Sequence, residues 1–199
     1  MTDRNLNLAA LIGSRICHDL ISPMGAVSNG LELLEISGGN MGDEITLAAR
    51  SAIYANARIR LFRIAFGIAS PHQTISSEEV SEILSQAYEG GRIKPVWSLT
   101  GDVSRQEAKM IIMAIFCAET ALPGGGKILM KKENETWMID AHSERIQMDE
   151  TLWARLDGQH VRPEITSAQV QFLLLPAVLA ELGRRCAYHL RGDSLHMRM

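Results

Sequence analysis

The sequence has few cysteines, no long basic run and no long apolar run, and each absence excludes a class of protein. Three cysteines lie far apart among 199 residues without a CxxC pair, which excludes a zinc framework and is typical of a reducing compartment. The net charge of −3 argues against a nucleic-acid binder. No apolar run approaches the ~18 residues of a membrane span, and the first residues lack a signal-peptide pattern. We therefore expect a cytoplasmic protein that binds neither membrane nor nucleic acid.

A long amphipathic helix is predicted at the N-terminus. Apolar residues recur there at spacings of three and four, namely Leu8, Ile12, Ile16, Leu20, Met24, Val27, Leu31 and Leu34. At ~100° per residue, His18 falls ~200° from Ile16 and Leu20, so its imidazole is expected to face water. Its neighbours on that outer face are mostly small or polar and would let another protein approach the ring; they are Asn7, Leu11, Ser14, Arg15, Ser22, Gly25 and Asn29.

Pro23 lies five residues after His18, inside the same predicted helix. It removes the hydrogen bond to the carbonyl of Asp19 and favours a kink. Such a proline costs ~3 kcal/mol relative to alanine in a helix interior. This cost beside an exposed histidine suggests a functional constraint, with an incidental kink as the alternative.

The first 71 residues are predicted to form a helical hairpin. A turn-rich segment at residues 37–42 ends the first helix, and Asp43 caps a second helix that ends before Ser70. Its arginines, Arg50, Arg58, Arg60 and Arg63, are expected mainly on a solvated face. A lone hairpin buries too little apolar surface to be stable. Dimerisation into a four-helix bundle is the simplest solution, and covering by the second half of the chain is the alternative.

Residues 72–199 have the pattern of an α+β sandwich. The expected order is a helix from about 77 to 88, a strand at 93–99, a helix at 105–122, strands at 127–132 and 136–141, a helix at 167–185, and one or two strands in the tail. The segment Pro123–Lys127 lacks the GxxxxGK[ST] pattern of a phosphate-binding loop, so a plain turn is expected there.

A catalytic triad of Cys17, His18 and Asp19 is excluded on geometry. Adjacent side chains on a helix diverge by ~100° per step and do not converge on one substrate atom. The same divergence argues against a metal site. Cys17 is expected to pack toward the bundle.

The segment His18-Asp19-Leu20-x-x-Pro23 resembles the H-box of bacterial sensor histidine kinases. The longer string from His18 to Leu34 is closer to the ChpT-type histidine phosphotransferases of alphaproteobacteria, and the resemblance extends over nearly the whole chain. It implies that residues 1–71 form a domain for dimerisation and phosphotransfer. It also implies that residues 72–199 form a degenerate Bergerat-type (HATPase-like) domain.

The nucleotide motifs of the kinases are mostly missing from that second domain. Cys117 stands where kinases have a magnesium-ligating asparagine. No glycine follows Asp140 in the stretch from Ile139 to Arg145, and none lies between Gln159 and Phe172 in the place of the glycine-rich lid. Without these residues, phosphates lose the backbone amides that would hold them. We expect no ATP, no cofactor and no metal bound to this chain.

The resemblance implies a phosphorelay in which His18 is the phosphoacceptor and Asp19 orients it. Helix geometry adds Leu11, Ser14, Arg15, Ser22 and Gly25 as candidates for partner binding. The implied donor is the receiver domain of a CckA-like hybrid kinase, and the implied acceptors are CtrA-like and CpdR-like response regulators, with Mg²⁺ held by the receiver. Two alternatives remain open: a non-enzymatic dimeric docking scaffold, and a divergent ATP-dependent autokinase.

Overall fold

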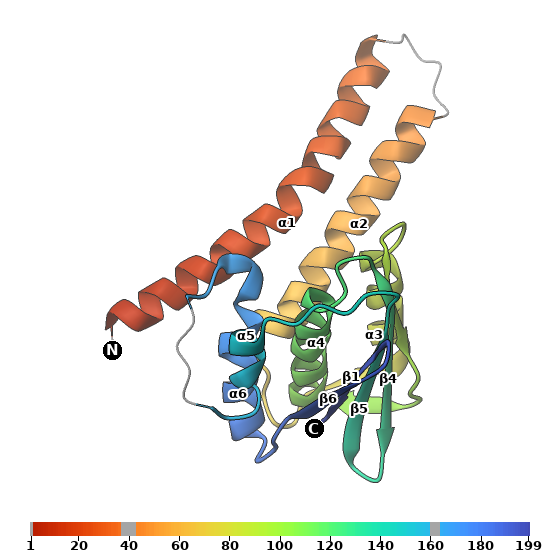
Figure 1. The fold of residues 1–199 in the computed structure, drawn as a ribbon. Helices are drawn as coiled ribbons and strands as arrows, with labels where there is room; N and C mark the ends of the chain where they lie inside the picture. The colour runs from red at the N-terminus through yellow and green to blue at the C-terminus, as the bar shows by residue number, and fades with distance from the viewer. Residues whose placement is uncertain (1, 37–42, 160–163) are drawn as a thin grey trace.

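The computed structural model describes residues 2–36, 43–159 and 164–199, and it begins with the predicted hairpin. Helix α1 (Thr2–Ile36) packs along α2 (Asp43–Phe66), and both project from the rest of the molecule (Figure 1). The predicted turn at 37–42 lies outside the described residues. Helix α1 continues through Pro23, which is buried, and it changes direction along its length (Figure 1).

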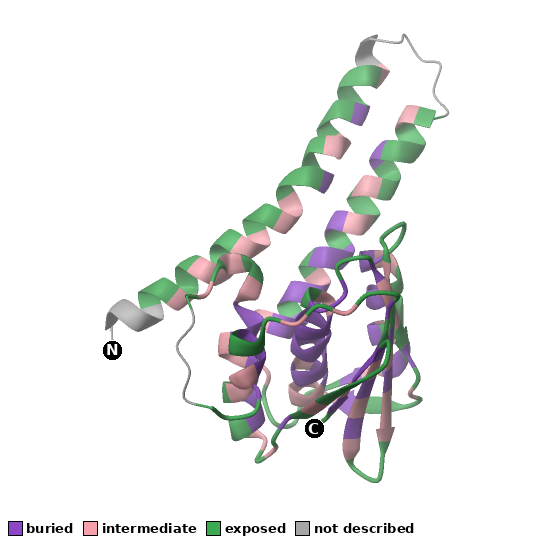
Figure 2. Cartoon of the chain, viewed as in Figure 1, coloured by how far each residue is buried: buried purple, intermediate pink, exposed green. Residues whose placement is uncertain are grey.

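The apolar stripe of α1 has a half-buried flank and an exposed flank. Ile12, Ile16 and Val27 are half-buried, whereas Met24 and Leu31 are 52% and 54% exposed. Only one flank of the stripe therefore faces α2, and the other flank has no cover in the single chain (Figure 2).

The second half of the chain contains short helices and two sheets. Its elements are β1 (Thr74–Ser76), α3 (Ser77–Ala87), β2 (Ile93–Trp97), β3 (Asp102–Ser104), α4 (Arg105–Thr120), β4 (Gly126–Glu133), β5 (Thr136–His142), α5 (Glu150–Ala154), η1 (Ser167–Gln169), α6 (Gln171–Glu181), β6 (Ala187–Arg191) and β7 (Ser194–Arg198). Five strands form one sheet in the order β2-β4-β5-β7-β6, in which β2 and β4 are parallel and the other neighbours antiparallel.

Helices α3 and α4 pack against one face of this sheet, α6 packs against α4, and α4 is the centre of the core (Figures 1 and 2). Phe116 of α4 and Trp137 of β5 are almost completely buried. Alternate strand residues point inward, among them Ile128, Ile139 and Met197, so the opposite face of the sheet is left open. This arrangement confirms the predicted α+β class.

The C-terminal part of α2 belongs to the same core. Leu61, Phe62 and Ala65 are buried against the second half, and Phe62 stacks with Phe66 and packs edge-on against Phe116. The second half therefore holds the lower end of the hairpin in a fixed orientation.

Most predicted elements are confirmed, and the missed ones are short. Strands β1 and β3 pair with each other and have three residues each, and α5 has five, which is too little sequence for a periodic signal. The expected turn is confirmed: Gly125 has a φ of 93°, and a Cβ there would meet the backbone oxygen of Arg92 at 2.6 Å. No helix among the described residues has the length and apolarity needed to cross a membrane.

Candidate functional site

His18 lies on α1 at the wall of a cleft of about 780 Å³ between the hairpin and the segment Ala87–Ile93. Its side chain is 84% exposed, as expected from its position opposite the apolar stripe. The imidazole ring is therefore accessible to a second macromolecule, while the backbone of His18 is fixed in the helix.

Asp19 is bonded to the ring of His18. Its Oδ1 atom lies 3.1 Å from Nδ1 of His18, so the short carboxylate reaches its neighbour although the two Cβ directions diverge. The divergence of neighbouring helix positions therefore does not keep these two side chains apart. Because an ionised carboxylate only accepts hydrogen bonds, Nδ1 is the donor and carries the proton, which leaves the lone pair on Nε2.

Two arginines hold the Asp19 carboxylate from the other side. Arg15 Nε lies 3.1 Å from Oδ2, and the guanidinium of Arg58 on α2 donates to the same oxygen. Burial alone would raise the pKa of Asp19, but Arg15, the bond from His18 and Arg58 outweigh it and lower the pKa below its usual value. Asp19 is therefore a stable anion and a fixed acceptor for the ring.

Arg58 was not identified from the sequence and was expected on a solvated face, yet its side chain is only 7% exposed. It contacts the ring of Phe62 at 4.8 Å and that of Tyr88 at 5.9 Å. The residue thus ties α2 and α3 to the acidic neighbour of His18. Its partner lies 39 residues away along the chain, so no local pattern could have indicated the pair.

Arg15 does not face solvent, contrary to the helical-wheel expectation. Its side chain is 14% exposed, and its Nη1 atom donates a hydrogen bond to the carbonyl of Ala168 at 2.8 Å. The guanidinium also lies 5.7 Å from the centre of the Phe116 ring. It therefore fixes α1 against η1 and the core. Cys17 is exposed in the single chain and lies one turn before Ile21 on the same side of α1, so its expected position toward the bundle stays a prediction.

The other candidates for partner binding are spread along one side of α1. Ser22 lines the cleft together with His18. Ser14 and Gly25 are exposed, and Leu11 is half-buried. A Cβ added to Gly25 would meet no atom within 4 Å, so the fold itself does not require glycine there.

Glu119 of α4 also lines the cleft, and it accepts a hydrogen bond from the hydroxyl of Tyr88. Burial raises the pKa of Glu119 to about 7, although Arg58 and Arg15 act in the opposite direction. A carboxyl group that titrates near neutral pH therefore lies beside the arginines that hold Asp19.

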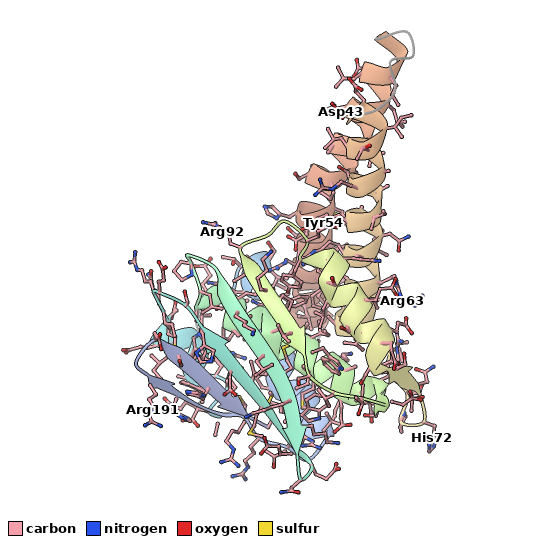
Figure 3. The ribbon with its side chains drawn as sticks, turned by 90° about the vertical axis from the view of Figure 1, so that its right-hand side faces the viewer. Asp43, Tyr54, Arg63, His72, Arg92 and Arg191 are labelled. Atoms are coloured by element: carbon pink, nitrogen blue, oxygen red, sulfur yellow. The ribbon has the colours of Figure 1, made fainter. Side chains whose placement is uncertain are left out.

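Cations line the outer wall of the cleft. Arg92 is exposed there (Figure 3), and Arg50 of α2 forms an ion pair with Glu89 at 3.8 Å. An anionic group entering the cleft would meet positive charge before it reached His18. Across residues 2–36, 43–159 and 164–199, no group of three or more His, Cys, Asp or Glu side chains is arranged to hold a metal ion.

Comparison with known proteins identifies the family. The family model for the histidine phosphotransferase C-terminal domain matches residues 77–194. Protein phosphotransferase ChpT of Brucella abortus (strain 2308) is 35% identical over 130 residues, which cover 64% of this chain and 62% of that protein. The match thus spans less than two thirds of the Brucella protein. The 1.7 Å structure of a bacterial phosphotransferase aligns over 97% of this chain and 95% of that one, with a TM-score of 0.76 and 26% identity. The chain therefore belongs to the histidine phosphotransferases and is a ChpT-type member of that family.

Proposed function

We propose that this protein carries a phosphoryl group on Nε2 of His18, taking it from a receiver-domain aspartate and passing it to an aspartate of a second receiver. The observation that carries the proposal is the exposed imidazole whose Nδ1 is bonded to a buried, doubly ion-paired Asp19. The family relationship supports the same chemistry. The partners follow from the resemblance: a CckA-like donor and CtrA-like or CpdR-like acceptors, in the cytoplasm.

The first transfer exchanges one bond to phosphorus for another. The Nε2 lone pair attacks phosphorus in line, and the bond between phosphorus and the aspartyl oxygen breaks. That oxygen leaves with the bonding electrons as a carboxylate. Nδ1 keeps its proton, so the phosphorylated ring becomes cationic and Asp19 stabilises it. The second transfer reverses these steps on another receiver.

Three features support a role without ATP. Cys117 is completely buried, so its position cannot present a metal ligand to the cleft. Asp140 points to the open face of the sheet, where it bonds Nδ1 of His196 at 2.7 Å. The sequence has no glycine between Gln159 and Phe172. In this proposal the second half is a degenerate ATPase-like domain, and Mg²⁺ belongs to the receiver.

The uncovered apolar flank of the hairpin supports a homodimer. Ile21 is 71% exposed on α1, and Ile53 and Ile59 are 49% and 51% exposed on α2. With Met24 and Leu31 they form an apolar surface that a second hairpin would bury as a four-helix bundle.

The test starts from a receiver domain labelled with ³²P on its aspartate. Wild type should acquire acid-labile label that His18→Ala does not. Label in His18→Ala would contradict the assignment. Receiver binding without transfer in wild type would favour the scaffold, and label from ATP alone, without any kinase, would favour the autokinase.

A further inference from the structure

The open face of the five-stranded sheet carries side chains that the proposed relay does not use. Strand register places Lys94, Lys127, His142, Ser194 and Arg191 in one row across all five strands. At about 4.8 Å per strand, such a row spans about 19 Å. The next rows on this face are Val96, Leu129, Asp140, His196 and His189, and then Lys131, Met138, Arg198 and Ala187. We call these fourteen residues the basic sheet face.

Positive charge is concentrated on this face, although the whole chain is net negative at −3. The face has five Lys or Arg side chains and one carboxylate, Asp140, which pairs with Lys131 at 3.6 Å. Glu133, in the next row of β4, pairs with the same lysine at 3.6 Å. Lys94, Lys127, Arg191 and Arg198 are exposed and have no carboxylate within ion-pair distance among the described residues. Figure 3 views this side of the sheet, with Arg191 at its edge.

The clustering of like charges on this face lowers the stability of the isolated chain. Lys94 and Lys127 are direct cross-strand partners on the same face, and like charges placed opposite each other destabilise a sheet. Lys127 lies opposite His142 on its other side, so no carboxylate separates the two lysines from the next strand. A ligand with several negative charges would remove this repulsion, and the flat, uncovered face is open to one.

We propose that the basic sheet face binds an acidic polypeptide segment of a partner protein. Asp140, in the middle row, favours a polypeptide because its carboxylate can accept backbone or side-chain N–H groups, whereas it would repel a phosphate chain. The strands also present no Trp, Tyr or Phe ring for base stacking on this face, because Trp97, Trp137 and Tyr188 alternate onto the side covered by helices. None of these face residues lines the His18 cleft.

The test uses the full chain and a fluorescent peptide of ten glutamates, with binding followed by anisotropy at low salt. Lys94→Gln with Lys127→Gln should weaken binding by about threefold to thirtyfold, the loss expected for two exposed ion pairs. The matched control is Arg60→Gln with Arg63→Gln on α2, which removes the same charge elsewhere and should bind like wild type. Binding should also fall as salt rises.

Parallel measurements with a 20-base-pair DNA duplex and with vesicles of phosphatidylglycerol and phosphatidylcholine separate the other classes of partner. Asp140→Asn should strengthen binding of a phosphate polymer more than binding of the peptide, because only the peptide has N–H groups that the Asp140 carboxylate can accept. The proposal is overturned if the peptide does not bind, if both double variants lose binding equally, or if only the duplex or the vesicles bind. Phosphotransfer to His18 should be unchanged in the Lys94/Lys127 variant, so this result does not depend on the proposed relay.

Discussion

Replacing Arg58 with methionine tests whether a buried ion pair holds His18, the proposed phosphoacceptor, in place. Methionine keeps an unbranched apolar stem against Phe62 and Tyr88 but removes the charge that pairs with Asp19. Both side chains of the pair are largely buried, at 7% and 14% exposed. Removing one partner of such a pair costs about 3–5 kcal/mol, because the remaining charge is left uncompensated.

The structure indicates the lower end of that range. Asp19 keeps Arg15 at 3.1 Å, and Nε of Arg58 has no hydrogen-bond partner among the described residues, so its burial already carries a cost that the variant removes. We expect a loss of about 3 kcal/mol of unfolding free energy, or a fall in Tm of about 6–12 °C for a chain of this size. Because Asp19 loses one of its two anchors, we expect transfer to His18 to slow by about tenfold to hundredfold.

The assay combines urea denaturation with the rate of transfer from a phosphorylated receiver. Arg63→Met is the matched control: Arg63 is exposed on the same helix, so stability should change by no more than about 0.5 kcal/mol. In a double-mutant cycle, Asp19→Asn and Arg58→Met should be non-additive, because each removes the same contact. The reasoning is refuted if Arg58→Met is as stable as the control and transfers at the wild-type rate.

Three further predictions concern the cleft and the hairpin. In Glu119→Gln we expect a change in the pH dependence of stability. The pKa of Glu119, about 7, lies above its value in the unfolded chain, so between these two values the native wild type keeps a proton that the unfolded chain has lost. The unfolding free energy of wild type should therefore fall by at most about 3 kcal/mol as pH rises from about 4.5 to 7. Urea titrations should show no such fall in the Gln variant, and an identical fall would contradict the assignment. Gly25→Leu should raise stability by up to about 1 kcal/mol, because the site is open and leucine favours helix, yet slow transfer at least about tenfold if receivers dock there; an unchanged rate would exclude that contact. Ile21→Glu should convert a dimer to a monomer in light scattering while Asn29→Glu does not, and a monomeric wild type would contradict the bundle.

Periodicity in the sequence was sufficient for the long elements. Apolar residues spaced by three and four predict the hairpin helices and α4, and apolar residues spaced by two predict the β4–β5 hairpin. Such spacings reflect burial of one face over many residues. The same periodicity placed His18 on the exposed side of α1, where the structure has it. Strands of three residues and the five-residue α5 are defined by pairing and capping, which leave no repeating pattern to detect.

The side chains that hold Asp19 and His18 in place could not be predicted, because they make contacts between parts of the chain that are distant in sequence. A helical wheel identifies the apolar stripe but not which flank of it meets α2, so Arg15 was placed on the exposed side. The ion pair between Asp19 and Arg58 and the position of Glu119 on the cleft wall need the packed structure. The exposed position of His18 can thus be predicted from the sequence, and the residues that hold it in place cannot.

The central claim is that Nε2 of His18 carries the phosphoryl group. It is tested most directly by mixing the protein with a phosphorylated receiver and Mg²⁺ in the absence of ATP, and then recording ³¹P NMR spectra together with peptide mapping by mass spectrometry under alkaline conditions. The account predicts a single phosphoramidate, bonded to Nε2 and located on the peptide that contains His18. A phosphoryl group on Nδ1, on another residue, or on no residue of this chain would contradict it.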